Sequence, residues 1–294
     1  TVIWVDLLVH LRAMEVFQDA GEDDRAKESL HQAGIDANEL ERFRDLPMSY
    51  EARWYYFNLT EQQEAAHDVA RKGYQNAQSA LTRWIYVFSL YEQGHFEDAL
   101  KAVEDMKGTA EDSNGDANSI SALPWMRPVV LAELTDGRSR AMQAYTKNCE
   151  LLRTGYHAIS NQAMALFLGE RGKAMGASKE LRKQPKRFTS FRHEHYLRIL
   201  DYCAGSISAE QLLSPEAGSR WNQCESHFYV AIDRLSQGDR AGAREHFQKV
   251  LATGVFVWME YHWSRLFLKR MEQDPNWPPW IPLKEPAIQP TTTP

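Results

Sequence analysis

The residues best suited to chemistry lie in "RHEHY", residues 192–196, where His193, Glu194 and His195 follow one another. Two histidines that bind one metal from a helix face are three or four residues apart, as in HExxH. His193 and His195 are only two apart, so they point to different sides of a helix. We interpret them as solvated or partner-facing side chains and predict no metal site. An enzyme with its site near His193 and His195 is the alternative.

A second stretch, "GERGK" at residues 169–173, resembles a phosphate-binding loop only superficially. Such a loop has four residues between its glycines and follows a strand, whereas here two residues separate the glycines and the pattern is helical. No GxSxG motif, protein-kinase motif set or paired Asp/Glu constellation is present either. The sequence therefore predicts no catalytic residue and no cofactor.

The composition of the 294 residues narrows the class further. With 40 acidic and 34 basic residues the net charge is −6, which disfavours a dedicated nucleic-acid binder. Hydrophobic residues make up 43% of the chain, enough for a buried core. The three cysteines have no CxxC spacing, which argues against a disulfide framework or a cysteine zinc site and favours a reducing, cytoplasmic setting. Charges interrupt every apolar stretch before 18 residues, so no membrane span is expected.

The first residue is Thr1, and the opening "TVIWVDLLVHL" lacks the basic region and cleavage motif of a signal peptide. We expect the chain to be a piece of a longer protein.

A recurring pattern divides the chain into units. In "SQGDRAGAREHFQKVL", residues 236–251, a glycine ends one amphipathic segment and precedes the next, and this arrangement recurs upstream at intervals of 33 to 43 residues. One glycine is missing, and there Thr60-Glu61-Gln62-Gln63 offers a Thr-x-x-Gln capping box that would start a helix. A polar stretch, residues 107–119, is predicted to be an inserted loop. The markers of the units are Gly21, Glu61, Gly94, Gly137, Gly172, Gly205 and Gly238.

Two other positions repeat with the markers. Five residues after each marker a small residue is expected, because two antiparallel helices cross closely there; the residues are Ala26, Ala66, Ala99, Met142, Ala177, Glu210 and Ala243. Eight residues before each marker, six of seven residues suit a buried helix face and only Arg53 does not; the residues are Ala13, Arg53, Tyr86, Val129, Met164, Leu197 and Val230. Each unit is therefore predicted to be helix, short turn, helix, with breaks near the glycines.

This pattern resembles the tetratricopeptide repeat, a helix-turn-helix unit. The best matches are "LTRWIYVFSLYEQGHFEDALKAVEDM" and "CESHFYVAIDRLSQGDRAGAREHFQKVL", and the resemblance covers roughly residues 7–251. It implies an all-α, right-handed superhelical solenoid of about seven helical hairpins over residues 1–251. Residues 252–273 are predicted to form a capping helix, and residues 274–294 an extended Pro/Trp-rich tail whose last dozen residues are disordered. Because Glu210 replaces the small residue, the fifth and sixth units are expected to pack irregularly.

The resemblance also implies a function. The chain is expected to be a non-catalytic protein–protein interaction scaffold, or a sensing arm in signalling. Its C-terminal end is similar to that of bacterial multi-domain tetratricopeptide proteins, some of which carry a Ser/Thr kinase domain upstream. In the family, the first helices line a concave groove that binds a peptide or protein. The residues that this geometry places in the groove are Tyr55, Trp84, Phe88, Tyr91, Arg127, Gln162, His195, Tyr202 and Phe228. The alternative for the aromatic members is packing between adjacent first helices.

Two surface features remain. Residues 179–198 carry seven Lys/Arg against two Glu, so this stretch is either a solvated helix end and loop or a docking site for an anionic partner. Trp277 and Trp280 flank Pro278-Pro279, and they either fold back over the terminal helix, onto Trp258 and Trp263, or form a docking motif. We favour folding back, because apolar area of that size rarely stays in contact with water.

Overall fold

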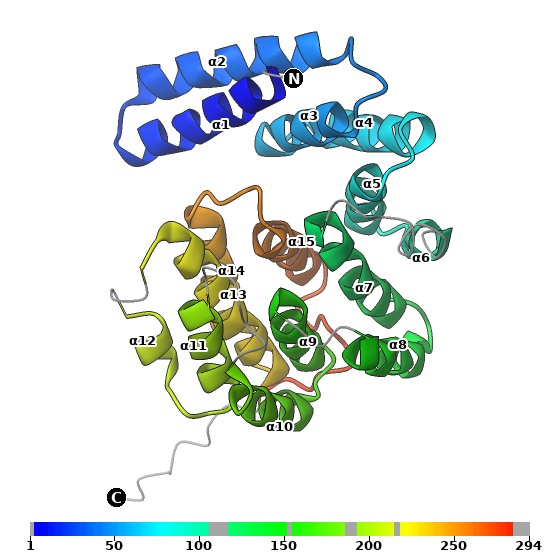
Figure 1. The fold of residues 1–294 in the computed structure, drawn as a ribbon, viewed down its shortest axis with the longest axis vertical. Coiled ribbons are helices and arrows are strands. Elements are labelled where there is room, and N and C mark those ends of the chain that lie inside the picture. The colour runs from blue at the N-terminus through cyan, green and yellow to red at the C-terminus, as the bar shows by residue number, and fades with distance from the viewer. Residues whose placement is uncertain (1–2, 106–116, 152–154, 186–192, 215–217, 285–294) are drawn as a thin grey trace, which may run out of the picture. The chain divides into compact units, whose positions relative to one another are not determined.

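The computed structural model describes residues 3–105, 117–151, 155–185, 193–214 and 218–284. Within these ranges the chain is helical, without a strand (Figure 1). The helices in chain order are α1 (Ile3–Asp19), α2 (Asp23–Leu40), α3 (Pro47–Leu59), α4 (Gln63–Asn76), α5 (Ala80–Glu92), α6 (Phe96–Glu104), α7 (Ala117–Ala132), α8 (Gly137–Leu151), α9 (Gly155–Phe167), α10 (Arg171–Arg182), α11 (His193–Cys203), α12 (Ala209–Leu212), α13 (Arg220–Ser236), α14 (Arg240–Ala252) and α15 (Met259–Gln273).

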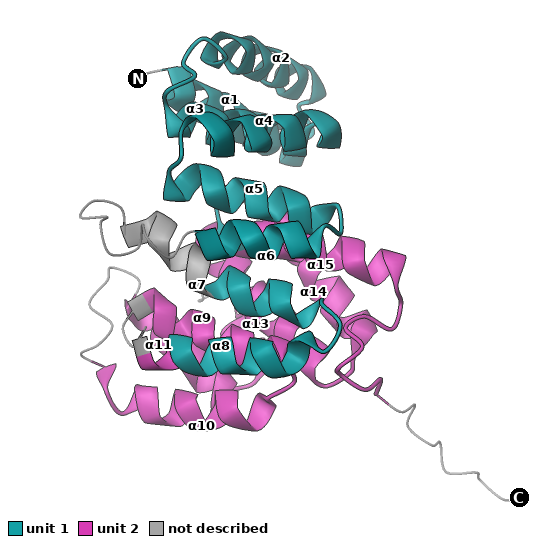
Figure 2. Ribbon diagram, turned by 90° about the vertical axis from the view of Figure 1, so that its right-hand side faces the viewer, with its two compact units in different colours: residues 1–148, 254–259 teal, residues 149–253, 260–294 magenta. Residues whose placement is uncertain are grey.

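Consecutive helices form hairpins, and consecutive hairpins stack through their first helices. In residues 1–148 the first helices α1, α3, α5 and α7 pack in sequence, each against the next. In residues 149–253, α9 packs against α11 and α11 against α13. The chain divides into two compact units, the first with residues 1–148 and 254–259, the second with residues 149–253 and 260–294 (Figure 2). Within the described residues, the predicted all-α array of helical hairpins is confirmed.

The turn inside each hairpin is set by one residue in the left-handed backbone conformation. Gly21, Gly94, Gly205 and Gly238 all have φ between +72° and +78°, a region that a glycine enters without steric cost. This conformation reverses the chain after the first helix, as the sequence pattern predicts.

Three turns differ from the prediction. Asp136 (φ +56°) rather than Gly137 takes the left-handed conformation in the α7–α8 turn, and Gly169 (φ +77°) rather than Gly172 takes it in the α9–α10 turn. Glu61 (φ +58°) itself occupies the turn between α3 and α4. The expected capping box is wrong, because the Thr60 hydroxyl donates to the Tyr56 carbonyl (2.8 Å) and α4 has no side-chain cap.

The small residue after the turn follows the left-handed residue, not the predicted marker. Counted five residues from Asp136 and Gly169, the buried positions are Ala141 and Ala174, both 0% exposed. The predictions at Met142 and Ala177 are therefore wrong by one and three positions, and the small buried residues are Ala141 and Ala174. Ala26, Ala66, Ala99 and Ala243 are buried as predicted. Glu210 is exposed on α12, which has only four residues, so the sixth hairpin is irregular as expected.

The C-terminal strap, residues 274–284, folds back on the second unit. Trp277 is fully buried, and its ring lies 5.2 Å from that of Phe267 and 5.9 Å from that of Phe167. The Trp280 indole Nε1 donates to the Phe167 carbonyl (2.8 Å). Folding back over the terminal helix is confirmed, and Phe267 of that helix and Phe167 of α9 are among the residues that the strap contacts.

The backbone of the strap turns twice and is not extended. Trp277 N donates to the Asp274 carbonyl, and Ile281 N donates to the Pro278 carbonyl. The Arg240 guanidinium of α14 donates to the carbonyl oxygens of Asn276 (3.3 Å), Pro278 (3.1 Å) and Ile281 (2.7 Å). One cationic side chain therefore holds both turns in place.

Two sequence predictions concern residues that lie largely outside the described ranges. Most of the inserted loop predicted at 107–119 lies outside them, and residues 117–119 already belong to α7. The disordered end predicted for the last dozen residues, 283–294, lies outside the described ranges from residue 285 onward. None of the described helices combines the length and apolar character that crossing a membrane requires.

Candidate functional site

Three of the aromatic residues predicted for the groove lie together in the core of the first unit. Tyr55 and Trp84 are 4% exposed and Phe88 is 0% exposed. Their rings pack with Trp54, which contacts Trp84 edge-on at 5.3 Å between ring centroids, and Trp84 contacts Phe88 in the same way. These contacts join α3 to α5, so the aromatic residues pack between adjacent first helices. For these three side chains the structure agrees with the alternative, packing between first helices, because none of them is exposed.

The other predicted residues are also held by intramolecular contacts. Tyr91 (1% exposed) donates to Glu133, and Gln162 (2%) donates to the Ala158 carbonyl. Phe228 (2%) packs near Phe247. Partner binding stays a prediction for the remaining half-buried side chains, Arg127, which pairs with Glu104 (3.0 Å), and Tyr202, which donates to Asp233 (2.9 Å).

The histidine stretch does not assemble a site. His195 is buried in the second unit with its Nε2 3.0 Å from Glu225 Oε2, whereas Glu194 is exposed and His193 is half-buried at the start of α11. No group of three or more His, Cys, Asp or Glu that could hold a metal ion lies within the described ranges.

The basic stretch at 179–198 is described only in part, because residues 186–192 lie outside the described ranges. Arg182 pairs with Asp201 (2.8 Å) and Lys183 with Glu180 (2.7 Å). Arg198 donates to the Gln211 carbonyl. The described cations are therefore partly neutralised.

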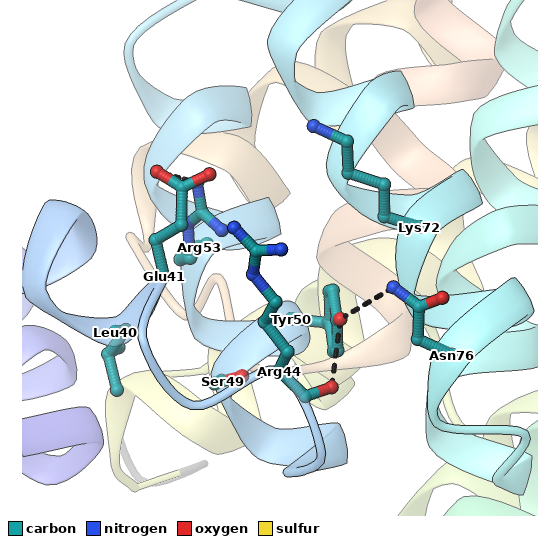
Figure 3. A pocket seen from close by; sticks show the side chains of 8 residues that line it. All are labelled: Leu40, Glu41, Arg44, Ser49, Tyr50, Arg53, Lys72 and Asn76. Atoms are coloured by element: carbon teal, nitrogen blue, oxygen red, sulfur yellow. Dashed lines mark hydrogen bonds and ion pairs between the residues drawn. The ribbon is translucent and has the colours of Figure 1, made fainter.

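A cavity in the first unit gathers cationic side chains from three elements (Figure 3). The cationic cavity has a volume of about 140 Å³ and lies beside the loop between α2 and α3. Arg44 comes from the loop, Arg53 from α3 and Lys72 from α4, and Glu41 is the one acidic side chain of the lining. The lining is Leu40, Glu41, Arg44, Ser49, Tyr50, Arg53, Lys72 and Asn76.

Arg53 is the unusual member of this lining. It is only 9% exposed, and its buried Nε has no hydrogen-bond partner among the described residues. Its ion pair with Glu41 spans 3.6 Å, which is too long for a hydrogen bond. Burial lowers the pKa of the Arg53 guanidinium, Glu41 opposes this effect, and the neighbouring Arg44 adds to it. The buried cation is therefore incompletely neutralised.

The two other cations lie nearer the solvent. Arg44 is exposed on the loop and forms no ion pair within the described part of the chain. Lys72 shares the Asp68 carboxylate with Arg71, at 2.6 and 2.5 Å. These hydrogen bonds, the one from Lys72 first, lower the pKa of Asp68. Counting Arg71 and Asp68 with the lining, four cations face two carboxylates.

Hydrogen bonds fix the loop that carries Arg44. The Ser49 hydroxyl lies 2.7 Å from the Phe43 carbonyl oxygen and 2.8 Å from the Leu46 carbonyl oxygen, and it donates its proton to these two acceptors. Tyr50, 3% exposed, donates its hydroxyl to the Arg44 carbonyl (2.9 Å) and accepts from Asn76 Nδ2 (3.2 Å), as Figure 3 shows.

The close packing of α3 on α4 depends on a glycine. A Cβ at Gly73 would lie 2.9 Å from Tyr50 Cγ, so only a glycine lets the Tyr50 ring come this near to α4. The ring in turn places the hydroxyl against the loop. The cavity is therefore organised before any ligand enters.

Such a cavity suits a carboxylate. A guanidinium presents a planar set of N–H donors that matches the two carboxylate oxygens, and charge-assisted hydrogen bonds of this kind are the stronger ones in proteins. An anion beside Arg44 would also reduce the repulsion between Arg44 and Arg53.

Sequence analysis missed this site, although one signal was present. Arg53 is the only charged residue at a position that is otherwise apolar or small in every unit. Arg44 and Lys72 carry no such signal, because exposed cations on loops and helices are common.

Comparisons with known proteins find one distant structural similarity. No protein-family model matches the chain, and no curated protein matches it. Among solved structures, a tetratricopeptide repeat protein from Parabacteroides merdae is similar, with 14% sequence identity and a TM-score of 0.41. The match covers 90% of this chain and 99% of the other.

Proposed function

We propose that the chain is a non-catalytic protein-interaction module that binds an acidic segment of a protein partner in the cationic cavity. A tetratricopeptide-like array of helical hairpins is typical of protein-interaction scaffolds. The observation that carries the proposal is Arg53, a buried guanidinium whose Nε has no hydrogen-bond partner among the described residues, beside Arg44, which forms no ion pair with them.

A protein carboxylate fits this cavity better than a nucleic acid. The whole chain has a net charge of −6, which repels a polyanion over long range, whereas one local cavity attracts one or two carboxylates at short range. A volume of about 140 Å³ is also below the size of typical small-molecule sites and suits a side chain.

A displayed library of random peptides tests the proposal. We expect the wild-type chain to enrich peptides that contain Asp or Glu, with binding that weakens as salt is raised. Arg44→Glu should abolish the enrichment, because it places a carboxylate where the ligand carboxylate would lie. The matched control is Arg42→Glu, which makes the same charge change two residues away on the same loop but outside the cavity.

Arg53→Met separates a binding role from a structural one. Replacing an incompletely neutralised buried charge with an apolar side chain of similar length is often neutral or stabilising, so the melting temperature should stay the same or rise. Affinity for an enriched acidic peptide should fall by about 2 kcal/mol or more. If the library shows no preference for acidic residues, or if Arg42→Glu and Arg44→Glu behave alike, the cationic cavity is not the binding site.

A further inference from the structure

A second cavity adjoins the cationic cavity. It has a volume of about 170 Å³ and shares two lining residues, Leu40 and Ser49, with the cationic cavity. The loop between α2 and α3 supplies side chains to both, Arg44 to one and Phe43 and Leu46 to the other. The lining of this apolar cavity is Ile3, Trp4, Leu40, Phe43, Leu46, Pro47, Met48 and Ser49.

The lining of the apolar cavity reaches the solvent. Phe43 is 37% exposed and Leu46 47% exposed, a large apolar area for two neighbours on a short loop. Ser49 and Trp4 carry the polar groups of the lining. The Ser49 hydroxyl is already bound to the two loop carbonyls, whereas the buried Trp4 Nε1 has no hydrogen-bond partner among the described residues. The cavity therefore offers mainly apolar contact and at most one free hydrogen-bond donor.

The size of the apolar cavity indicates its occupant. An apolar cavity of about 150 Å³ holds one benzene ring. The apolar cavity is of that size, so it can take one large side chain such as Phe or Leu but not a lipid acyl chain. An acidic group bound in the cationic cavity and one apolar side chain bound beside it are features of a short peptide rather than of a membrane.

We infer that the two cavities form one binding surface for an extended peptide that places Asp or Glu in the cationic cavity and a large apolar side chain in the apolar cavity. This inference rests on the proposed function and specifies its partner. Because the cavities share a wall, the two peptide residues should lie within about three positions of each other; residues two apart in an extended chain are on one face and about 6.6 Å apart.

The experiment uses the full chain and the peptide library. The wild type should enrich peptides in which a Phe, Leu, Ile, Met or Trp lies within three positions of Asp or Glu. The double variant Phe43→Ser/Leu46→Ser should keep the acidic preference and lose the apolar one. Both substituted residues are exposed, so the fold should tolerate the change. Val9→Ser is the matched control, because Val9 is 55% exposed on α1 and lines neither cavity.

A double-mutant cycle then measures the contact directly. One enriched peptide, amidated at its C-terminus, and its apolar-to-Ala derivative are titrated by fluorescence anisotropy. In the wild type the Ala derivative should bind about 10- to 100-fold more weakly, as expected when binding buries a Leu or Phe side chain of the peptide. In Phe43→Ser/Leu46→Ser the two peptides should bind equally.

Each outcome has a distinct meaning. Acidic enrichment without an apolar neighbour overturns this inference and leaves the proposed function intact. An apolar preference that persists in Phe43→Ser/Leu46→Ser also overturns it, because the apolar residue would then bind elsewhere. Dimers of the wild type that the double variant abolishes would identify a second copy as the occupant. If no acidic peptide is enriched, the proposed function fails, and this inference fails with it.

Discussion

His227 of α13 and His246 of α14 face each other, with their Nδ1 atoms 3.0 Å apart. One Nδ1 must donate to the other, so the pair accepts this geometry only while at least one ring is neutral. Burial and then the charge of His246 lower the pKa of His227 to about 4. Burial and then Lys249 lower the pKa of His246, with Glu245 acting in the opposite direction.

The pair predicts acid sensitivity of the second unit. A histidine in the unfolded chain has a pKa of about 6.5. Between about pH 6.5 and pH 4 the unfolded chain therefore binds protons that the folded pair does not bind. The free energy of unfolding is therefore fully maintained above this window and falls as the pH drops through it. His227→Gln should reduce the loss between about pH 7.5 and pH 5 by roughly 1 kcal/mol, after allowance for solvent exposure. Urea unfolding at the two pH values measures it, and an unchanged loss would contradict the role of the pair.

At the residue scale, sequence predicts burial better than it predicts a site. Arg53 is conspicuous in the sequence because its position is apolar or small in the other units. Its meaning depends on Arg44 and Lys72, which reach it from a loop and another helix. The aromatic residues of the predicted groove show the reverse problem. Trp84 and Phe88 have the spacing of one helix face, but spacing does not tell whether a face meets solvent or the next hairpin.

At the element scale, glycine is a good but incomplete marker of the hairpin turn. The turns at Gly94, Gly205 and Gly238 are predictable, because glycine has no steric cost in the left-handed region. The turn at Asp136 is not, since a short polar side chain tolerates the same conformation and the adjacent Gly137 draws attention instead. In the α9–α10 turn two glycines compete, and only the structure assigns the turn to Gly169.

The alanine that follows each turn yields a prediction about packing. Ala243 of α14 is 0% exposed, so Ala243→Leu should overpack the helix crossing and lower the free energy of unfolding by about 1–3 kcal/mol. Ala241 lies exposed on the same helix, and Ala241→Leu should change stability by no more than about 0.5 kcal/mol. Urea unfolding of both variants makes the comparison. Equal midpoints would show that the α13–α14 crossing has room for a larger side chain.

At the scale of the whole molecule, the C-terminal strap completes the second unit. Phe167, Phe267 and Trp277 form one aromatic cluster from α9, α15 and the strap. A terminal element that covers the last hairpins is what a stack of helical hairpins requires, because its end would otherwise expose apolar surface. Here Phe267 of α15 and Trp277 of the strap both pack near Phe167 of α9.

Arg240→Met tests how firmly the strap is held. The change removes the donor for three strap carbonyls, and a lost hydrogen bond of this kind costs about 1–3 kcal/mol. We expect faster chymotrypsin cleavage after Trp280 and a lower melting temperature. Arg234→Met is the matched control, because Arg234 pairs with Asp239 and forms no hydrogen bond or ion pair with the strap in the described residues. Equal cleavage rates in the two variants would show that the aromatic cluster alone holds the strap.

Gly238, in the turn between α13 and α14, is also in close contact with the strap. A Cβ at this residue would lie 2.3 Å from the Pro282 carbonyl oxygen and 2.5 Å from Lys284 N, because the strap crosses directly over the turn. The Lys284 N–H donates to the Gly238 carbonyl (3.2 Å) at the same place. For protein engineering this makes two similar turns unequal. Asn or Asp at Gly94, where the space beside the glycine is open, would change the structure little. The same substitution at Gly238 would displace the strap from the turn.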